Sequence, residues 1–406
     1  MTDRRPLLLL TNRYPFGSGE EYLEHEIRQL VRRFDRVVVL PCMPPNTTAA
    51  RAVPDNVVVV RYQQPDHRRD LPRMLWRGHR GLSSRPTHPV HRAYDSYFEG
   101  RAQAVADAAT PALVDALHGQ VPAVIYSYWF YITARVGIEL RRRLNWNVAL
   151  VSRAHGYDVN VHASPARYLP QRPLLLEGCD RVHPVSDAAT RYLQETYPSM
   201  ASKVATRRLG TPEPPSSSVA SRNPVTVVTC SMIRPLKRLD LVRDAVAILR
   251  ERGHDVRWTH FGSGPRRQLD RLRGSPSDSS WIDLRGYVPN AQIFAEYQAL
   301  APSVFINAST SEGVPVSVME AMGCGIPVLA TDVGGTRELL GPLDTWALLP
   351  ADLTAEHLAA QVESMVLAVD DTYAARAHDV RKRWESVARG DTLYADFADE
   401  LLSLCP

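Results

Sequence analysis

Short apolar runs alternate with amphipathic stretches from one end of the 406-residue chain to the other. The clearest example begins with an apolar run at 7–10 and a loop with two glycines. A helix over 23–34, with its apolar positions on one face, and a second run at 37–40 follow. This order is typical of two parallel strands joined by a crossover helix. The pattern predicts an α/β protein in which helices cover parallel sheets.

The length and the spacing of these runs predict two Rossmann-like domains. Further strands are expected at 57–60, 124–126, 148–151, 182–185, 225–228, 256–261, 304–306 and 328–330. We predict an N-terminal domain over 1–211, a Pro/Ser-rich linker over 212–224, a C-terminal domain over 225–385 and a helix over 386–406 that packs across the domains. Because parallel sheets bind ligands at the carboxyl ends of their strands, the function is expected in a cleft between the domains.

Residues 61–101 hold nine arginines, four histidines and several prolines without a long clean period. We interpret this stretch as an irregular helical excursion. Its cations and aromatic residues are compatible with an anionic lipid-linked acceptor or with peripheral contact to a membrane surface. A solvated insertion explains the same composition and is the favoured reading of the two.

Composition excludes several classes of protein. Hydrophobic residues at 44% and charged residues at 23% are average for soluble domains, and no apolar run approaches the about 20 residues of a membrane helix. A net charge of +4 is too small to indicate a nucleic-acid partner. Five scattered cysteines without a CxxC pair argue against a disulfide framework and a zinc site. With no apolar run long enough for a secretion signal, a cytoplasmic protein is expected.

The segment 311–325, SEGVPVSVMEAMGCG, is the strongest candidate site. It follows a strand and predicts a helix that begins near Pro315, whose first amides, at Val316 and Ser317, would attract an anion. Glu312 and Glu320 lie about two helical turns apart and would line one wall at different depths. Glutamates at such positions are often ordinary helix residues. Here Gly313 and several small neighbours favour close approach of a ligand.

A second candidate is SMIRPLKRLD at 231–240, in which Arg234 and Lys237 follow a strand. Both cations can point at one anion, as in a phosphate clamp. The alternative is a solvated basic helix start, which the helix dipole disfavours. Two weaker signals are FGSGP with Gly262, which also fits an ordinary turn, and RGYVPN, whose backbone at Tyr287 and Val288 could meet a base.

The N-terminal half offers two further candidates. SRAHGYDVN places His155 and Asp158 directly after a strand, although lone histidines are as often structural. Gly17 and Gly19 precede the first helix, where amides could face a phosphate or the acceptor, but their spacing is not that of a dinucleotide-binding GxGxxG motif. No Asp-x-Asp pair occurs. No metal is therefore predicted, and cations and amides would meet any phosphate charge.

Together these motifs resemble the retaining glycosyltransferases of family four, which have the two-domain GT-B fold. Residues 311–340 resemble the E-x7-E region of that family, and FGSGP resembles its G-x-G-P turn. RPLKRLD resembles its R-x-x-K-G-x-D segment, with Arg238 where glycine is usual. TNRYPFGSGEEYLEHEI with SRAHGYD is similar to bacterial members that build surface polysaccharides.

The resemblance implies a role for each candidate residue. Arg234 and Lys237 would grip the donor diphosphate, assisted by amides around Gly17 to Gly19 and at Val316 and Ser317. Glu320 would bind the ribose and Glu312 the transferred sugar, while the segment at Tyr287 and Val288 would pack on the base. His155 would approach the sugar from the other domain, and Asp158 would contact the acceptor.

The resemblance also implies a metal-independent retaining transfer of a sugar from a nucleotide donor, with UDP favoured over GDP and dTDP. The leaving phosphate would act as the base, so no protein nucleophile is assigned. The residues alone do not decide whether the acceptor is a polysaccharide precursor or a natural-product scaffold. A nucleotide-sugar epimerase, a pseudo-glycosyltransferase and a nucleotide-sugar-binding subunit without turnover remain alternatives on the same fold.

Overall fold

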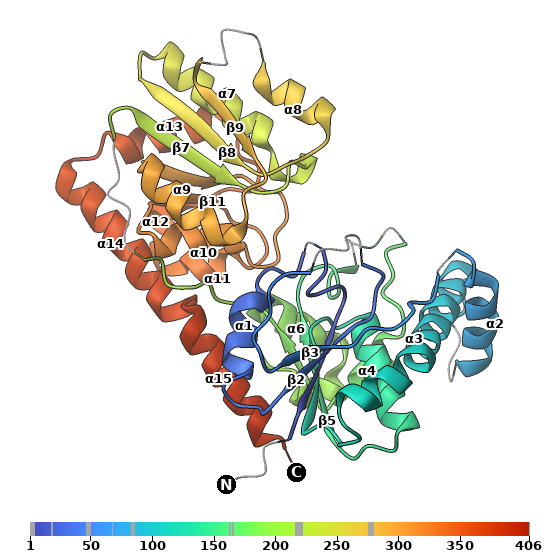
Figure 1. Ribbon diagram of the computed structural model, residues 1–406. Helices are drawn as coiled ribbons and strands as arrows, with labels where there is room; N and C mark the ends of the chain where they lie inside the picture. Colours follow the sequence, from blue (N-terminus) through green and yellow to red (C-terminus); the bar gives the residue numbers. More distant parts are fainter. Residues whose placement is uncertain are drawn as a thin grey trace. The chain divides into compact units, whose positions relative to one another are not determined.

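The computed structural model describes residues 5–17, 19–45, 50–66, 68–82, 86–161, 164, 166–215, 222–274 and 280–405. The chain divides into two compact units (Figure 1), Met1–Arg208 with Thr392–Pro406, and Leu209–Asp391. Each unit contains one six-stranded sheet whose strands are all parallel. The predicted α/β class is therefore confirmed. Of the predicted linker, residues 216–221 lie outside the described residues.

The sheet of the N-terminal unit has the strand order β3-β2-β1-β4-β5-β6. Its strands are β1 (Leu7–Thr11), β2 (Val37–Pro41), β3 (Val57–Val59), β4 (Val124–Ser127), β5 (Ala149–Ala154) and β6 (Arg181–Pro184). All six were expected from their apolar runs. Helices cover both faces of the sheet, so the central strands are buried on both sides and their sequences are continuously apolar.

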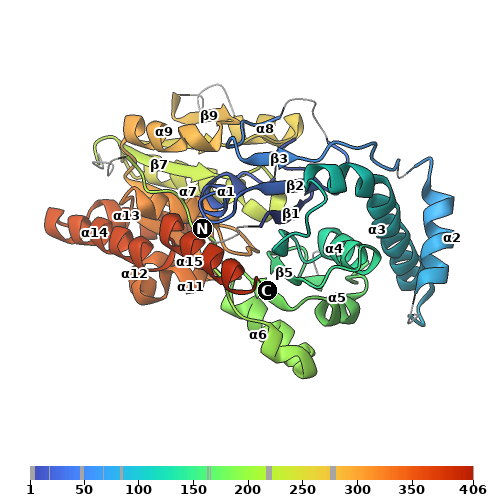
Figure 2. The ribbon, with the colours of Figure 1, turned by 60° about the horizontal axis from the view of Figure 1, so that its bottom comes forward.

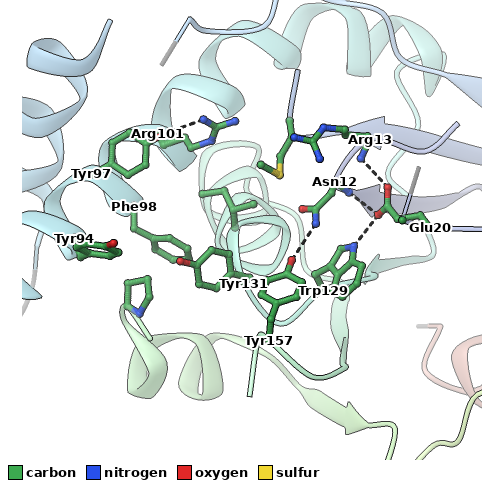
Figure 3. Close-up of a pocket in the computed structure, with 14 residues that line it drawn as sticks. Asn12, Arg13, Glu20, Tyr94, Tyr97, Phe98, Arg101, Trp129, Tyr131 and Tyr157 are labelled. Carbon is green, nitrogen blue, oxygen red and sulfur yellow. Dashed lines mark hydrogen bonds between the residues drawn. The ribbon is translucent and has the colours of Figure 1, made fainter. Parts of the chain in front are cut away.

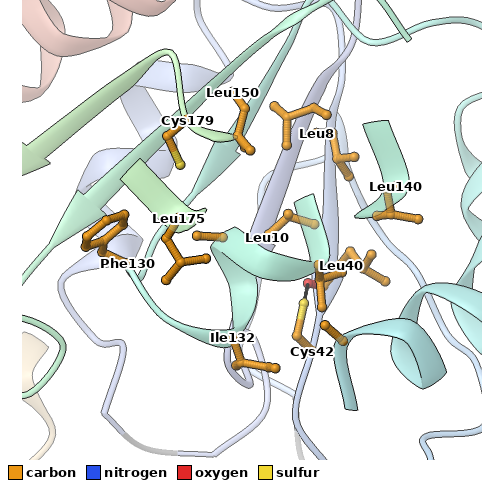
Figure 4. Close-up of a cluster of buried hydrophobic side chains, with 14 of the residues drawn as sticks. Leu8, Leu10, Leu40, Cys42, Phe130, Ile132, Leu140, Leu150, Leu175 and Cys179 are labelled. Atoms are coloured by element: carbon orange, nitrogen blue, oxygen red, sulfur yellow. Dashed lines mark hydrogen bonds between the residues drawn. The ribbon is translucent and has the colours of Figure 1, made fainter. Parts of the chain in front are cut away.

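The helices of this unit are α1 (Leu23–Leu30), α2 (Leu71–Gly81), α3 (Pro89–Ala116), α4 (Ile132–Arg143), α5 (Arg172–Gly178), α6 (Asp187–Thr196) and α15 (Gly390–Ser403). Helices of this unit pack on both faces of the sheet, and α2 lies outside them against α3. Side chains of α3, α4 and α5 pack on one face, where Leu10, Leu150 and Leu140 belong to one cluster (Figure 4). On the other face, side chains of α1 and α15 pack together, with Phe397 and Leu401 fully buried.

The helical excursion expected at 61–101 is present, but it is more regular than expected, because α2 and α3 are regular helices packed side by side (Figures 1 and 2). They touch at glycines: a Cβ at Gly78 would lie 1.7 Å from the Ser96 carbonyl oxygen, and one at Gly100 1.8 Å from that of Met74. The apolar residues of α3 show no clear helical period because α3 packs against both α2 and α4, which buries side chains on more than one face of the helix.

The C-terminal unit repeats the topology, with the order β12-β11-β10-β7-β8-β9. Its strands are β7 (Val225–Cys230), β8 (Val256–Phe261), β9 (Ile282–Gly286), β10 (Val304–Asn307), β11 (Val328–Thr331) and β12 (Leu348–Leu349). Its helices are α7 (Leu239–Glu251), α8 (Arg266–Arg273), α9 (Ile293–Leu300), α10 (Val316–Gly323), α11 (Thr336–Leu340), α12 (Asp344–Ala347), α13 (Ala355–Val366) and α14 (Asp370–Val387). The first and fourth strands are neighbours in both sheets, and the connections leave them in opposite directions. Such a switch point is where α/β sheets bind ligands.

Candidate functional site

The loops after β7 and β10 meet at the switch point of the C-terminal unit. The Lys237 ammonium donates to Glu312 Oε1 at 2.6 Å, and the two side chains are only 20% and 11% exposed. The amide of Thr310 donates to the carbonyl oxygen of Leu236 at 2.8 Å, which joins the loop backbones. The structure therefore brings together the first glutamate and the lysine of the two predicted motifs.

Glu312 has two further donors that the sequence argument missed. Its Oε1 also accepts hydrogen bonds from Asn307 Nδ2 at 3.0 Å and from Ser309 Oγ at 2.7 Å. Asn307 is the last residue of β10 and Ser309 follows two residues later, so their position before the glutamate was the available signal. Three hydrogen bonds to one oxygen therefore fix the Glu312 carboxylate at the switch point.

Arg234 lies beside this cluster but not in it. Its side chain is exposed, its nearest polar contact is Met232 Sδ at 3.6 Å, and among the described residues it has no carboxylate partner within ion-pair distance. Its carbonyl oxygen accepts the amide of Lys237 at 2.9 Å, which closes the 3₁₀ turn Pro235–Lys237. The main chain of Arg234 thus positions the lysine, while its guanidinium is available to a ligand.

The start of α10 is the predicted anion site. Helix α10 begins at Val316, directly after Pro315, and the carbonyl oxygen of Pro315 accepts the amides of Val318 and Met319. The amides of Val316 and Ser317 lie in the first turn, where a helix offers donors that the helix itself does not use. The predicted helix start is confirmed.

A glycine pair that the sequence argument left unused supports the loop before α10. A Cβ at Gly334 would lie 1.9 Å from the carbonyl oxygen of Glu312, and one at Gly335 would lie 2.5 Å from that of Gly313. The amide of Gly335 donates to the Gly313 carbonyl oxygen at 2.7 Å. Only glycines allow this close approach, which holds Glu312 and Gly313 in place.

Glu320 lies deeper than Glu312 and is 3% exposed. Burial raises its pKa from 4.5 to about 7, and the opposing hydrogen bond from Asn290 Nδ2, at 2.6 Å, favours the ionised form. That bond brings the RGYVPN segment to the second glutamate. In the segment, Tyr287 is 64% exposed and Val288 is half-buried.

Gly262 stands where β8 ends, between these loops. Its φ of +141° is in the region that favours glycine, and a Cβ there would lie 1.7 Å from the carbonyl oxygen of Ser231. Its amide donates to the carbonyl oxygen of Gly286 at 2.8 Å. The glycine therefore allows the ends of β7, β8 and β9 to approach one another.

In the N-terminal unit, His155 follows β5 and is held by its surroundings. Its Nε2 lies 2.9 Å from the Tyr128 carbonyl oxygen, to which it can only donate, and its ring packs against Trp129 at 4.4 Å. Burial, with a smaller effect of the Arg153 charge, lowers its pKa to about 3. The imidazole is therefore neutral near pH 7, with Nδ1 as the acceptor.

Asp158 is fully buried and positions this loop. Its Oδ1 accepts the amide of His155 at 2.7 Å and its Oδ2 accepts that of Phe130 at 2.9 Å. Burial raises its pKa to about 6, against the opposing charge of Arg172. With no exposed surface, its carboxylate cannot touch an acceptor in this conformation.

The glycines before α1 have positive φ angles, +84° at Gly17 and +103° at Gly19. The amide of Gly19 donates to the Glu21 carboxylate at 2.9 Å. The neighbouring Glu20, which the sequence did not single out, accepts four hydrogen bonds at 2.7–2.8 Å, from the amides of Asn12, Arg13 and Tyr14 and from the indole Nε1 of Trp129. Glu20 thus ties the loop after β1 to the loop after β4.

No group of three or more His, Cys, Asp and Glu side chains in the described part of the chain could hold a metal ion. None of the helices described here is both long and apolar enough to cross a membrane.

Comparison with known sequences identifies the C-terminal unit. Residues 223–367 match the sequence profile of the family described as glycosyl transferases group 1. The chain is 29% identical over 217 residues to the putative colanic acid biosynthesis glycosyltransferase WcaL of Escherichia coli K12. The aligned residues cover 51% of this chain and 53% of WcaL. The chain is 26% identical over 183 residues to the GtfA subunit of a UDP-N-acetylglucosamine–peptide N-acetylglucosaminyltransferase of Streptococcus pneumoniae, covering 44% of this chain and 35% of that protein. The chain thus spans about half the length of WcaL and less of GtfA.

Comparison with solved structures extends over both units. Sucrose-phosphate synthase of Thermosynechococcus elongatus superposes with a TM-score of 0.71 at 18% identity, covering 99% of each chain. HepE of Anabaena in complex with UDP-glucose gives a TM-score of 0.65 at 17% identity over 98% of this chain and 100% of HepE. The expected GT-B architecture is confirmed by this likeness. Residues 223–367 thus match the profile of the group 1 glycosyltransferases, the family that the motifs of the chain resemble, and the likeness to solved structures adds the fold of both units.

Proposed function

We propose that the protein moves a sugar from a nucleotide diphosphate donor, with UDP preferred, to a hydroxyl group of an acceptor, with retention of configuration and without a metal ion. The observation that carries the proposal is the Lys237–Glu312 contact at the switch point of a unit that matches the family profile. The complexes of HepE with UDP and with UDP-glucose support the choice of nucleotide.

The chemistry we assign begins at the phosphates. Departure of a nucleoside diphosphate builds negative charge on its oxygens, and groups aimed at that charge stabilise the transition state more than the ground state. Arg234 and Lys237 supply fixed cations, and Val316 and Ser317 supply amides. A diphosphate that draws Lys237 toward itself leaves Glu312 to accept hydrogen bonds from the transferred sugar, beside Gly313.

The nucleoside is assigned to the deeper part of the same unit. The Glu320 carboxylate would accept hydrogen bonds from the ribose hydroxyls, with Asn290 fixing its orientation. Tyr287 and Val288 would pack on the base, since Tyr287 is largely exposed beside this carboxylate. Gly262 would let the backbone come close to the nucleotide.

In the N-terminal unit we assign His155 to the transferred sugar. Because its Nε2 proton is committed to Tyr128, the neutral ring would accept a sugar hydroxyl through Nδ1. Asp158 acts through the His155 amide and is a positioning residue. Gly17 and Gly19 shape the adjoining loop, and the leaving phosphate takes the acceptor proton.

Replacing the lysine tests the central assignment. Lys237→Met should lower kcat for sugar transfer, or for donor hydrolysis, by about 10²–10³, the usual loss for one donor to a developing oxyanion. Lys382→Met, which removes an exposed lysine of the same unit, is the matched control and should keep full activity. Equal activity of the two variants would remove Lys237 from the site.

The same assay separates the alternatives. EDTA should leave turnover intact if no metal takes part, and strict dependence on magnesium or manganese would contradict the proposal. Labelled donor distinguishes transfer from epimerisation and from a pseudo-glycosyl bond, because each gives a different product. Release of UDP in the presence of an acceptor excludes a binding subunit without turnover.

We further propose a peripheral contact with the cytoplasmic face of an anionic membrane through α2. Trp76 is 60% exposed, its ring stacks under Arg80 at 4.7 Å, and Leu71 and Arg73 are exposed on the same helix. Aromatic and apolar side chains among arginines fit an anionic lipid surface. Vesicles that contain the anionic lipid phosphatidylglycerol should sediment the protein, and vesicles of neutral phosphatidylcholine should not. Trp76→Ala should weaken this binding, whereas Tyr192→Ala, on an exposed tyrosine of α6, should not.

A further inference from the structure

The N-terminal unit contains a pocket of about 450 Å³, within the range of small-molecule sites. Four rings follow one another along its wall (Figure 3). The centroids of Phe98 and Tyr131 are 4.9 Å apart, those of Tyr131 and Tyr157 5.9 Å, and those of Tyr157 and Trp129 4.9 Å. Such a wall offers flat aromatic faces to a ring-shaped ligand.

Arg101, on α3, lines the same pocket and is 7% exposed. Its guanidinium donates to Tyr97 Oη at 3.1 Å and to the Cys42 carbonyl oxygen at 3.4 Å. Among the described residues, no carboxylate lies within ion-pair distance of it. These two neutral partners leave the positive charge uncompensated and other N–H groups of the guanidinium available.

Two other buried arginines of this unit are paired with carboxylates, whereas Arg172, which does not line the pocket, donates to the Phe130 carbonyl oxygen at 2.8 Å. Arg135 is paired with Glu99, and Arg153 with Glu26 at 3.3 Å. Burying a cation without a counterion is costly, so a buried guanidinium at a pocket surface is a receptor for an anion. Guanidinium groups bind carboxylate and phosphate oxygens in pairs, which adds direction to the attraction.

The charges around the pocket place the anion at one end. Arg13 also lines it. Its Nε donates to the Pro44 carbonyl oxygen at 3.0 Å, and among the described residues no carboxylate forms an ion pair with its guanidinium. The one carboxylate of the lining, Glu20, already accepts four donors and lies beside Trp129, whereas Arg101 lies beside Tyr97 (Figure 3). An anionic group is therefore attracted to the Arg101 end.

We propose that this pocket binds an acceptor glycoside that carries an anionic group. The sugar ring stacks on the wall of Phe98, Tyr131, Tyr157 and Trp129, and the carboxylate or phosphate binds Arg101 with Arg13 nearby. The inference rests on the proposed transferase function, which it deepens by naming the class of acceptor. His155 packs against the same Trp129, so the pocket adjoins the residue assigned to the transferred sugar.

Calorimetry with matched ligands tests the anion preference. p-Nitrophenyl glucuronide and p-nitrophenyl glucoside differ only in a carboxylate against a hydroxymethyl group, and p-nitrophenyl glucoside 6-phosphate adds the phosphate arm. At least one of the two anionic ligands should bind about ten- to hundredfold more tightly than the glucoside, the worth of a charge-assisted hydrogen bond. The tighter of the two identifies the acidic group.

Arg101→Gln should abolish that preference and leave the affinity for the neutral glucoside unchanged. Arg101→Lys, which keeps the charge but loses the paired geometry, should retain part of it. Arg36→Gln, at a half-buried arginine away from the pocket, is the control and should keep the preference. No preference in the unchanged protein, or a preference that survives in Arg101→Gln, overturns the inference.

UDP-glucose binding to each protein separates this inference from the proposed function. If UDP-glucose binds and the anionic glycosides show no preference, the acceptor class is wrong and the transferase proposal stands. If UDP-glucose fails to bind the unchanged protein, the transferase proposal itself fails.

Discussion

Glu320 combines burial with a single strong hydrogen-bond donor, Asn290. Its pKa of about 7, against 4.5 for a free glutamate, means that the folded protein favours the protonated form. The stability that comes from this proton is complete below pH 4.5 and is lost as the pH rises to about 7. Above that value the folded protein contains a buried carboxylate that a ligand with hydroxyl groups would stabilise.

Donor binding should therefore depend on pH. Hydroxyl donors from ribose favour the ionised carboxylate, so binding releases a proton and the affinity for UDP-glucose should rise from pH 5 to about 7 and then level off. If donor binding lowers the pKa of Glu320 by one pH unit, the affinity at neutral pH exceeds that at acidic pH by about tenfold. UDP-glucose is the suitable ligand for calorimetry because its diphosphate does not titrate in this range.

Glu320→Gln is the control for this profile, since it keeps the size and removes the titration. Its affinity should be nearly independent of pH between 5 and 8. A variant with the same pH profile as the unchanged protein would show that another group is responsible, and the ribose assignment would lose its support.

In the lysine motif, the sequence predicted the residues that meet at the site but not all of their contacts. Residue types and spacing were enough to select Lys237 and Glu312, and the structure brings them together. The φ of Arg238, +47°, is in the left-handed region, which explains why glycine is usual at this position of the motif. Its guanidinium turns to the carbonyl oxygens of Ala308 and Ala351, at 2.6 and 2.9 Å, contacts that no sequence pattern predicts.

At the scale of elements, the loop before α10 depends on a neighbouring loop for its shape. Gly334 and Gly335, which follow β11, contact the backbone of Glu312 and Gly313 without room for a side chain. The φ of Gly334, +56°, adds a second reason for glycine there. The position of the first glutamate is thus decided by two segments more than twenty residues apart.

Gly334→Ala should displace the Glu312 loop, because the new Cβ would overlap a backbone oxygen that cannot turn aside. We expect a fall in kcat for donor turnover of at least about tenfold, equal to about 1.4 kcal/mol of barrier. Two control variants separate backbone strain from steric overlap. A Cβ at Gly341 would meet open space without a positive φ, and a Cβ at Gly253 would meet open space at a positive φ. Activity lost equally in Gly253→Ala and Gly334→Ala would assign the effect to general destabilisation.

Periodicity predicted elements better than contacts between elements. Ten of the twelve described strands and the helix α7, with Leu239 and Val242 buried on one face, follow from local pattern, whereas β9 and β12 were not predicted. The close crossing of α2 and α3 does not, because it depends on Gly78 and Gly100 meeting backbone from the other helix. Glu20 was missed for the same reason, since its four donors come from segments that only the fold brings near.

At the scale of the whole molecule, the chain ends in the unit where it begins. Thr392–Pro406 belong with Met1–Arg208, so most of α15 completes the first core. Phe397 is fully buried there, with its ring 5.2 Å from that of Tyr126 and the Arg153 guanidinium 4.2 Å above it. Arg33 pairs with Asp399 at the edge of this contact. The stability of the N-terminal unit therefore depends on residues at the opposite end of the sequence.

Phe397→Ala should lower the free energy of unfolding of the N-terminal unit by about 3–5 kcal/mol, since it removes a fully buried ring and the closer of the two aromatic rings that face the Arg153 guanidinium. Urea denaturation followed by tryptophan fluorescence measures this loss, because Trp129 and Trp146 both lie in that unit. Leu402→Ala, on an apolar residue of the same helix that is 40% exposed, is the matched control and should change the free energy by less than about 1 kcal/mol. UDP affinity should stay unchanged in both variants, because the residues proposed to bind the nucleotide all belong to Leu209–Asp391. Equal stability of the two variants would mean that α15 contributes little to the N-terminal core.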